Sequence, residues 1–386
     1  MVYLDYNAST PVDQRVLPVV VEAHAVYANP ASTHHFAGQR AAELVEEARG
    51  RVGSLVSRPT QDVVFTSGAT EAAVLGLLGA MVGVPSRPNA IVAVTEHKAI
   101  LAAAELGARL SGGEVRTALV DENGLVDLAR LRELLDDSVA VVAVMAANNE
   151  TGVLGPVAAV ADAARSMGAL TFIDATQLAG KGHLDDVTRA ADLMVMSSHK
   201  IYGPKGAGAL IASRTVQKSL VPIAPGGGQE RGLRGGTHNT PSIVGFGLAA
   251  ELAAKEHVQD AARIGELASE LLADLQHRLP GVALNGDGAA RLSNTLNLRF
   301  EGADAEAVMA SMPSIQVSAG SACESAVSMP SHVLLAMGMS GTAASESLRI
   351  SLGRPTTREE IKIAGDAIVE AVTRVRELTR DEETRE

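Results

Sequence analysis

The sequence predicts an α/β fold, in which a large domain built on a mostly parallel seven-stranded sheet is joined to a smaller α+β domain. From about residue 62 to 213, short β-branched runs alternate with longer helical patterns. Continuous apolar strands separated by helices of about 10–15 residues are typical of a parallel sheet covered on both faces. The alternation stops past residue 240, where one long helical stretch precedes further strands and a final helix. This change of pattern indicates the second domain.

Each expected element follows from its local pattern. The seven candidate strands of the large sheet are DVVFT (62–66), IVAVT (91–95), EVRTALV (114–120), VAVVAVM (139–145), ALTFI (169–173), ADLMVM (191–196) and GAGALIAS (206–213). Amphipathic patterns between them predict helices over 69–81, 98–110, 126–137 and 156–168. In the second domain we expect a helix over 251–279, strands over 295–300 and 347–353, and a helix near the end of the sequence.

Composition excludes several classes of function. A net charge of −12 provides no basic field for phosphate backbones, so we expect no direct nucleic-acid binding. No apolar stretch is long enough to span a bilayer, and we expect no membrane association. Cys323 is the only cysteine, and Met1 leads into VYLDYNAST without an apolar leader, which predicts a reducing, cytoplasmic setting. We predict no metal site.

Polar side chains follow five of the candidate strands. They are Thr66 to Glu71 (TSGATE), Glu96 with His97, Asn148 to Glu150 (NNE), Asp174 to Gln177 (DATQ) and Ser197 to Lys200 (SSHK). A single Asp, Asn or Ser at a strand end is usually a turn residue or a helix cap. Open α/β sheets, however, bind ligands beyond the carboxyl ends of their strands, so five such segments together predict a binding site at this edge.

Two glycine-containing segments bear on phosphate binding. TSGATE lies at a strand-to-helix turn, where glycine allows close backbone approach and free N–H groups at the helix start attract an anion. The sequence has neither GxxxxGK[ST] nor a GxGxxG opening the first strand-helix unit, so a nucleotide is not favoured. We interpret GGGQERGLRGGT at 226–237 as a mobile or tightly turning loop, although its Arg and Thr residues could meet a phosphate.

Lys200 is the most informative residue of the strand-end set. Most lysines extend into solvent, but Lys200 stands at a strand end within SSHKIYGPKG, before a Tyr-Gly-Pro turn that would hold it near the crevice. Asp174 would lie at the same edge. A lysine that forms a Schiff base, with a carboxylate facing a pyridinium nitrogen, is the pair that pyridoxal 5'-phosphate requires.

At this point the chain resembles the cysteine desulfurases of the class V aminotransferase group, which are fold-type I pyridoxal-phosphate enzymes. The matching segments run in family order from about residue 3 to 360: YLDYNASTPVD, NPASTHHF, FTSGATE, TEHKAIL, NNETGV, DATQ, SSHKIYGPKG, GGGQERGLRGGT, SAGSACES and SLGRPTT. SSHKIYGPKG together with GSAC is the most specific part. We therefore expect a large cofactor-binding domain at 12–250 and a small domain formed by 1–11 and 251–386, which carries the cysteine.

The resemblance implies a role for each matching residue. Lys200 would form the Schiff base, Asp174 would face the pyridine nitrogen, Gln177 would bind the ring hydroxyl, and His97 would stack on the ring and handle protons. The phosphate would be held by Ala69, Thr70, Ser197, Ser198 and His199, with Thr237 reaching over from the second subunit of a homodimer. Asn149 and Arg354 would hold the substrate carboxylate.

The lone cysteine completes this interpretation. A free thiol is by default a small buried hydrophobe, but core cysteines are not usually framed by Ser, Gly and Glu as Cys323 is. The resemblance implies that Cys323 lies on a mobile loop and attacks the sulfur of L-cysteine, leaving an enzyme persulfide and alanine. Glu324 beside it should disfavour the thiolate, so we expect slow or partner-dependent turnover.

Two alternatives stay open from the sequence. One is a selenocysteine lyase or another class V aminotransferase that does not use Cys323, and the other is a sulfur-carrier subunit with little turnover. If the chain is a desulfurase or a sulfur-carrier subunit, we expect a separate protein to accept the sulfur. Iron-sulfur cluster assembly, tRNA thiolation and DNA sulfur modification would each need only a different docking surface.

Overall fold

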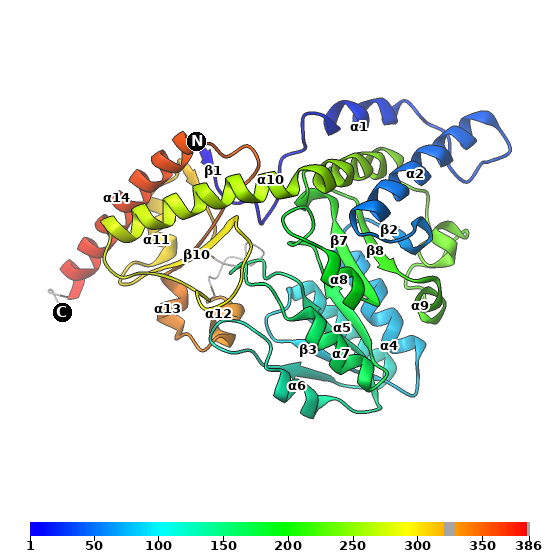
Figure 1. The fold of residues 1–386 in the computed structure, drawn as a ribbon, viewed down its shortest axis with the longest axis horizontal. Coiled ribbons are helices and arrows are strands. Elements are labelled where there is room, and N and C mark those ends of the chain that lie inside the picture. Colours follow the sequence, from blue (N-terminus) through cyan, green and yellow to red (C-terminus); the bar gives the residue numbers. More distant parts are fainter. Residues whose placement is uncertain (320–328, 384–386) are drawn as a thin grey trace.

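The computed structural model describes residues 1–319 and 329–383 and contains a seven-stranded sheet in the strand order β2-β8-β7-β6-β5-β3-β4 (Figure 1). These strands are β2 (Val63–Thr66), β3 (Asn89–Ala93), β4 (Val115–Ala118), β5 (Val139–Met145), β6 (Leu170–Asp174), β7 (Leu193–Ser197) and β8 (Gly208–Ala212). Only β8 runs antiparallel to its neighbours. Because β8 alone is reversed, the six other strands end at the same edge of the sheet.

Helices cover both faces of this sheet. They are α1 (Val16–His24), α2 (Phe36–Leu55), α3 (Ala69–Ala73), α4 (Gly79–Gly83), α5 (Lys98–Ser111), α6 (Leu128–Leu134), α7 (Val157–Ser166), α8 (Asp185–Ala190) and α9 (Arg214–Ser219). Short turns complete the set: the 3-10 turns η1 (Thr60–Asp62), η3 (Ser198–Lys200) and η4 (Gln229–Gly232), and one π-helical turn, η2 (Val74–Leu78), which joins α3 to α4.

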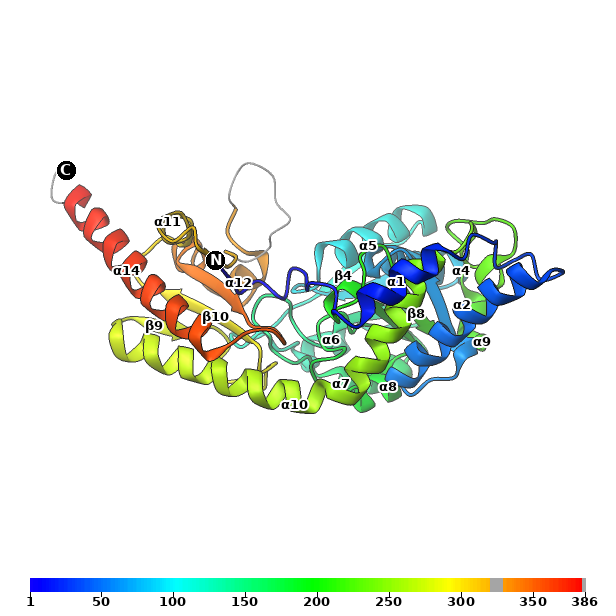
Figure 2. The same ribbon diagram turned by 90° about the horizontal axis from the view of Figure 1, so that it is seen from above.

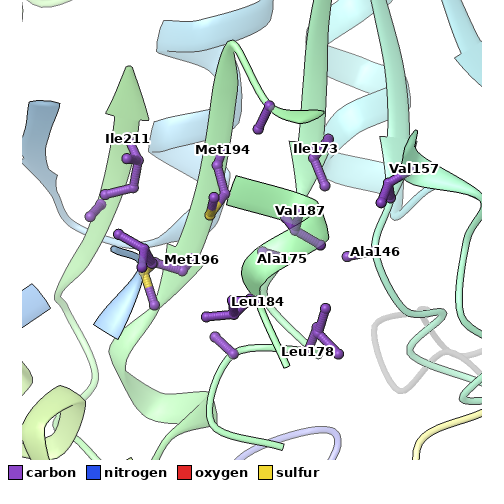
Figure 3. Close-up of a cluster of buried hydrophobic side chains, with 14 of the residues drawn as sticks. Ala146, Val157, Ile173, Ala175, Leu178, Leu184, Val187, Met194, Met196 and Ile211 are labelled. Carbon is purple, nitrogen blue, oxygen red and sulfur yellow. The ribbon is translucent and has the colours of Figure 1, made fainter. Parts of the chain in front are cut away.

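Alternate strand residues build two separate cores. Phe65 and Ile173 belong to the core beneath α2, α7 and α10, whereas Val64 and Phe172 belong to the core beneath α3, α4 and α5. A strand turns successive side chains to opposite faces, so continuous apolar runs are needed where both faces are covered. Figure 3 shows part of the first core, in which Ile173 and its strand neighbours pack around Val187 of α8.

The chain from residue 240 onward forms a third core and a smaller cluster that includes Val333 and Ala344. Its elements are α10 (Thr240–Arg278), β9 (Val282–Leu284), β10 (Thr295–Phe300), α11 (Ala305–Ser311), β11 (Ile315–Gln316), α12 (His332–Ala336), α13 (Gly341–Ser345), β12 (Ser347–Ser351) and α14 (Arg358–Glu383). β9, β10 and β12 form an antiparallel sheet. The first strand, β1 (Val2–Tyr3), pairs with β11, which brings the start of the chain to this half.

Helix α10 connects the two halves (Figures 1 and 2). Its N-terminal part contributes Phe246 to a core of the large sheet, and its C-terminal part contributes Leu271 to the third core. The boundary that we place between residues 250 and 251 therefore falls inside one continuous helix, and it stays a prediction. Among the described residues, none of the helices has the length and apolar character needed to cross a membrane.

Candidate active site

A cavity of about 580 Å³ opens at the carboxyl ends of the parallel strands. Its lining includes most of the residues that the sequence selects: Ala69, Thr70, His97, Asn149, Asp174, Gln177, Ser197, His199 and Lys200. They converge although they are scattered over more than 130 positions, because neighbouring parallel strands end at one edge. This cavity is the candidate active site.

Lys200 and Asp174 line the same cavity from two adjacent strands. Asp174 ends β6 and pairs in register with Val195 of β7, and Lys200 ends the η3 turn that follows β7. The Lys200 Nζ donates to the main-chain oxygens of Asn7 at 2.5 Å and Ala8 at 2.7 Å. Asp174 is 9% exposed and accepts the main-chain N–H of Thr176 at 2.8 Å. An amine and a carboxylate are thus held by the backbone at the cavity wall.

The opposite part of the cavity suits an anion. Ala69 and Thr70 begin the helical run that follows β2, and the N–H groups of a helix start favour negative charge. Gly208 lies directly behind this turn, where a Cβ atom would come within 2.6 Å of the Gly68 backbone. A larger residue at position 208 would push the turn away from its place in the wall.

This donor set fits pyridoxal phosphate. The helix start with Ser197 and Lys205 offers donors for a phosphate, and Lys200 with Asp174 supplies the amine and the acid for the ring. Thr176 Oγ1, a buried hydroxyl beside Asp174, has no hydrogen-bond partner among the described residues. Buried polar groups are normally satisfied, so such an orphan at a cavity wall is consistent with a ligand that contributes the missing partner.

The two histidines of the predicted set differ in surroundings. Burial, followed by the charges of Lys200, Lys205 and Lys181, lowers the pKa of His199 to about 4, so this ring is neutral near pH 7. Its Nδ1 lies 3.2 Å from Ser9 Oγ. Burial is also the main cause that lowers the pKa of His97. Neither ring is therefore expected to add positive charge to the cavity.

His97 has a defined tautomer. It caps helix α5, and its Nδ1 accepts the main-chain N–H of Ala99 at 3.1 Å. A neutral ring whose Nδ1 accepts must carry its proton on Nε2. His97 therefore offers a hydrogen-bond donor, Nε2–H, from this ring.

Glu96 and His332 lie beside His97. Burial, and then the charge of Asp174, raise the pKa of Glu96 well above its ordinary value, and neither carboxylate oxygen has a partner among the described residues. His332 lines the cavity from α12 and its Nε2 donates to the Glu96 main-chain oxygen at 3.0 Å. The C-terminal half of the chain therefore contributes directly to this wall.

Two predicted residues, Ser198 and Arg354, do not line this cavity, and Thr237 was expected to act from the second subunit. Ser198 is buried away from the cavity, with its hydroxyl against Gly203, and Thr237 is exposed. Arg354 does not line the cavity because its guanidinium pairs with Asp13 and Asp260, each at 2.8 Å. Cys323 lies outside the described residues.

Three residues that the sequence analysis did not assign belong to the site: Asn7, Lys181 and Arg349. Asn7 and Arg349 line the cavity, and Lys181 contacts Asn7 and Gln177 from behind it. Arg349 is 2% exposed within β12, and its Nε has no hydrogen-bond partner among the described residues. Arg349 could have been found, because it is the one charged residue inside the otherwise uncharged strand SLRIS.

Comparisons with known proteins show the family of the chain. The family model for aminotransferase class-V matches residues 2–363. A curated relative named cysteine desulfurase, from Frankia sp. (strain EuIK1), is 48% identical over 98% of this chain and 93% of its own. A solved structure described as a NifS-like protein superposes with a TM-score of 0.87 at 32% identity, covering 96% of this chain and 99% of that one. A structure described as SspA in complex with cysteine gives a TM-score of 0.81 at 30% identity, over 92% and 100% of the two chains.

Proposed function

From the premise that this chain belongs to the class-V aminotransferase family and is a pyridoxal-phosphate-dependent cysteine desulfurase, we infer that the cavity beside Lys200 is where L-cysteine gives up its sulfur. The observation that carries this inference is the meeting of Lys200 and Asp174 at one cavity beside an anion-binding turn. When bound, the cofactor supplies an electron sink at the substrate α carbon. Residues of the chain would bind the substrate and transfer its protons.

We assign Lys200 two roles, attachment of the cofactor and transfer of the substrate α proton. Its Nζ is oriented by the main-chain oxygens of Asn7 and Ala8, which hold the amine at the cavity wall. Asp174 would keep the ring nitrogen protonated, since an adjacent carboxylate favours the charged form of a base. His97 would hold the substrate thiol through its Nε2–H, and it would return a proton to the substrate only after taking one up itself.

Arg349 is the better candidate for the substrate carboxylate. Its Nη1 donates to the Asn149 main-chain oxygen at 3.1 Å and its Nη2 pairs with Asp5 at 2.7 Å, which leaves the buried Nε for a ligand. Guanidinium groups bind carboxylates through charge-assisted hydrogen bonds. We therefore transfer to Arg349 the role that the family resemblance gave to Arg354, and we keep Asn149 beside it.

The sulfur acceptor on this chain is Cys323, a proposal that rests on the sequence. The Cys323 thiolate would bond to the substrate sulfur as the bond between that sulfur and the β carbon breaks. The balance is L-cysteine plus a thiol giving L-alanine plus a persulfide. A separate acceptor protein would then remove the sulfur for iron-sulfur cluster assembly, tRNA thiolation or DNA sulfur modification, in the reducing cytoplasm that a single cysteine favours.

A homodimer is consistent with the surface. Tyr27 is 93% exposed and Phe36 is 81% exposed, although large apolar side chains of this kind usually pack against something. Thr237 is exposed on the glycine-rich loop, where it is available to a second copy. Sedimentation equilibrium of the wild type and of a Tyr27→Lys, Phe36→Lys variant tests this, because a dimer at this surface should dissociate in the variant.

The test of the reaction is the release of alanine and sulfide from L-cysteine with a reductant present. Cys323→Ser should bind the cofactor and lose sulfide release, whereas Ser325→Ala in the same segment should retain it. Unchanged turnover in Cys323→Ser would move the assignment to a lyase or aminotransferase. Release of alanine only after a partner is added would instead indicate a sulfur-carrier subunit.

A further inference from the structure

Lys181 follows the DATQ segment and makes a chain of hydrogen bonds with Gln177 and Asn7. Its Nζ donates to Gln177 Oε1 at 2.6 Å and to Asn7 Oδ1 at 3.2 Å. The Gln177 Nε2 in turn donates to the Asn7 main-chain oxygen at 2.9 Å. Asn7 is 1% exposed and Gln177 is 5% exposed, so this network has little competition from water.

These contacts determine which way the Gln177 amide points. The Asn7 carbonyl can only accept, so nitrogen must face it, and the Lys181 amine donates, so oxygen must face Lys181. Both neighbours select the same orientation. The group that Gln177 has left to offer the cavity is therefore its second N–H.

Gln177 is also adjacent to the reacting nitrogen. The Asn7 main-chain oxygen accepts from Gln177 Nε2 at 2.9 Å and from Lys200 Nζ at 2.5 Å. The two nitrogens therefore contact the same oxygen atom and lie close to each other. In pyridoxal phosphate the ring oxygen is next to the carbon that the lysine attacks. An N–H beside Lys200 is thus placed to donate to that oxygen.

Lys181 lacks the partners of an ordinary lysine. Among the described residues no carboxylate lies within ion-pair distance of its Nζ. Burial, followed by the charges of Lys200 and Arg349, lowers the pKa of Lys181 well below its ordinary value. Lys181 is only half-buried, but it has no acid within reach, so charge pairing does not account for its position.

We propose that Lys181 is a positioning residue that acts through Gln177. By donating to Oε1 it fixes the amide with N–H toward the ring oxygen of the cofactor, and it polarises the amide so that this N–H donates more strongly. The inference rests on the proposed function, because it requires the cofactor at Lys200. Lys181 itself touches neither the cofactor nor the substrate.

The test is a pH titration of the visible absorbance of the holoenzyme, without substrate. A donor to the ring oxygen stabilises the more negative, deprotonated form of the lysine-bound cofactor, so Lys181→Met should raise the midpoint by roughly half a pH unit. Lys181→Gln, which can still donate, should recover part of this shift. Lys218→Met, which removes an exposed lysine on α9, is the control for loss of one charge and should leave the midpoint unchanged.

A double-mutant cycle identifies the route. If Lys181 acts through Gln177, Lys181→Met should cause no further shift in a Gln177→Ala background. An unshifted midpoint in Lys181→Met, or a full shift that persists without Gln177, would overturn the proposal. If Lys181→Met does not fold with cofactor, Lys181→Gln carries the same cycle. Absence of any visible band in the wild type would instead refute the proposed function.

Discussion

Arg349 and Arg354 are separated by only four residues, yet they stand in opposite surroundings. Arg349 is almost fully buried at the cavity, pairs with one carboxylate, that of Asp5, and has an unpartnered Nε. Arg354 lies off the cavity, pairs with both Asp13 and Asp260, and stacks on Tyr202 with 4.4 Å to the ring centroid. Arg349 therefore has a buried donor without a partner beside the cavity, whereas Arg354 is held by carboxylates away from the cavity.

The difference shows how to separate ligand-binding from structural arginines. A motif match selected Arg354, whereas position at the cavity wall together with a buried unpartnered donor selects Arg349. A carboxylate ligand would have to displace two existing ion pairs at Arg354, but it would complete the hydrogen bonding of Arg349. Substitutions at Arg349, Arg354 and Asp13 test this contrast.

The largest expected effect is on catalysis at Arg349. Arg349→Gln should lower kcat/KM for L-cysteine by about 100- to 1000-fold, because the substrate carboxylate loses both the positive charge and the charge-assisted hydrogen bond from Nε. Arg349→Lys keeps the charge without the planar fork and should lose less. Steady-state kinetics and the cofactor spectrum measure this, and a loss below tenfold with cofactor bound would argue against Arg349 as the carboxylate ligand.

A stability effect without a kinetic effect is expected at Arg354. Arg354→Met leaves the partly buried Asp13 and Asp260 without their partner and should lower the free energy of unfolding by about 2 kcal/mol. KM should change less than about threefold, by comparison with the large effects of residues that touch substrate. Urea unfolding and kinetics are measured side by side. Arg358→Met, which removes an exposed ion pair with Glu270, should leave stability unchanged.

A selective rise of KM in Arg354→Met, with stability intact, would reverse the contrast. It would return the substrate carboxylate to Arg354 and leave Arg349 as the structural residue.

The smallest expected effect is on protein stability at acid pH, through Asp13, an ion-pair partner of Arg354. The hydrogen bond from Arg15 is the first cause that lowers the pKa of Asp13 to about 2, with Arg354 contributing further. A carboxyl with a depressed folded-state pKa contributes stability above its ordinary pKa near 3.8 and loses it as the pH falls toward 2. Asp13→Asn should remove the pH-dependent part of the free energy of unfolding that Asp13 contributes, which is about 1 kcal/mol or less because solvent screens this group. The Tm of the variant should therefore fall less than that of the wild type as the pH is lowered.

The measurement is thermal unfolding between pH 2 and pH 6 for wild type and variant. Parallel profiles would show that Asp13 does not bind protons differently in the folded and unfolded chain. Glu256, whose pKa is also lowered chiefly by Arg15, should behave in the same way and provides a second position to examine.

Much of the fold was predictable because the large sheet is built from local patterns. The seven expected strands are found, since most of them are continuous apolar runs such as VAVVAVM that need no distant information to be recognised. The family model and the solved structures confirm the fold class. The sequence analysis assigned no helix to α2, whose mean hydropathy is low and whose residues carry many charges. The long helix α10 also begins earlier than expected, at Thr240.

The glycine-rich run behaves as its composition suggests. Glu230 and Arg231 adopt left-handed φ angles of 44° and 58°, so the segment turns tightly. Glu230 is buried and pairs with Arg49 at 2.8 Å, with the His238 ring close by. This buried pair could not be foreseen, because its members are 181 positions apart.

The candidate site was predictable where its residues follow strands and not elsewhere. Lys200, Asp174 and Gln177 lie at one edge because strand order alone brings them there. Asn7 gave no local signal, since its contacts are with residues such as Ser351, 344 positions away. The ion pair of Arg354 could not be predicted for the same reason, because the position of Asp260 relative to it is a matter of packing.

The position of Asn7 has a consequence for how the protein is made. Asn7 supports Lys200 and Gln177 but is itself held by Ser351, and Asp5 is held by Arg349. At a synthesis rate of about 5–20 residues per second, the start of the chain must wait roughly 17 to 70 s for residues that emerge 344 positions later. A nascent chain can therefore complete the large sheet well before its active site is formed. It cannot bind the cofactor in the final geometry until translation is nearly finished.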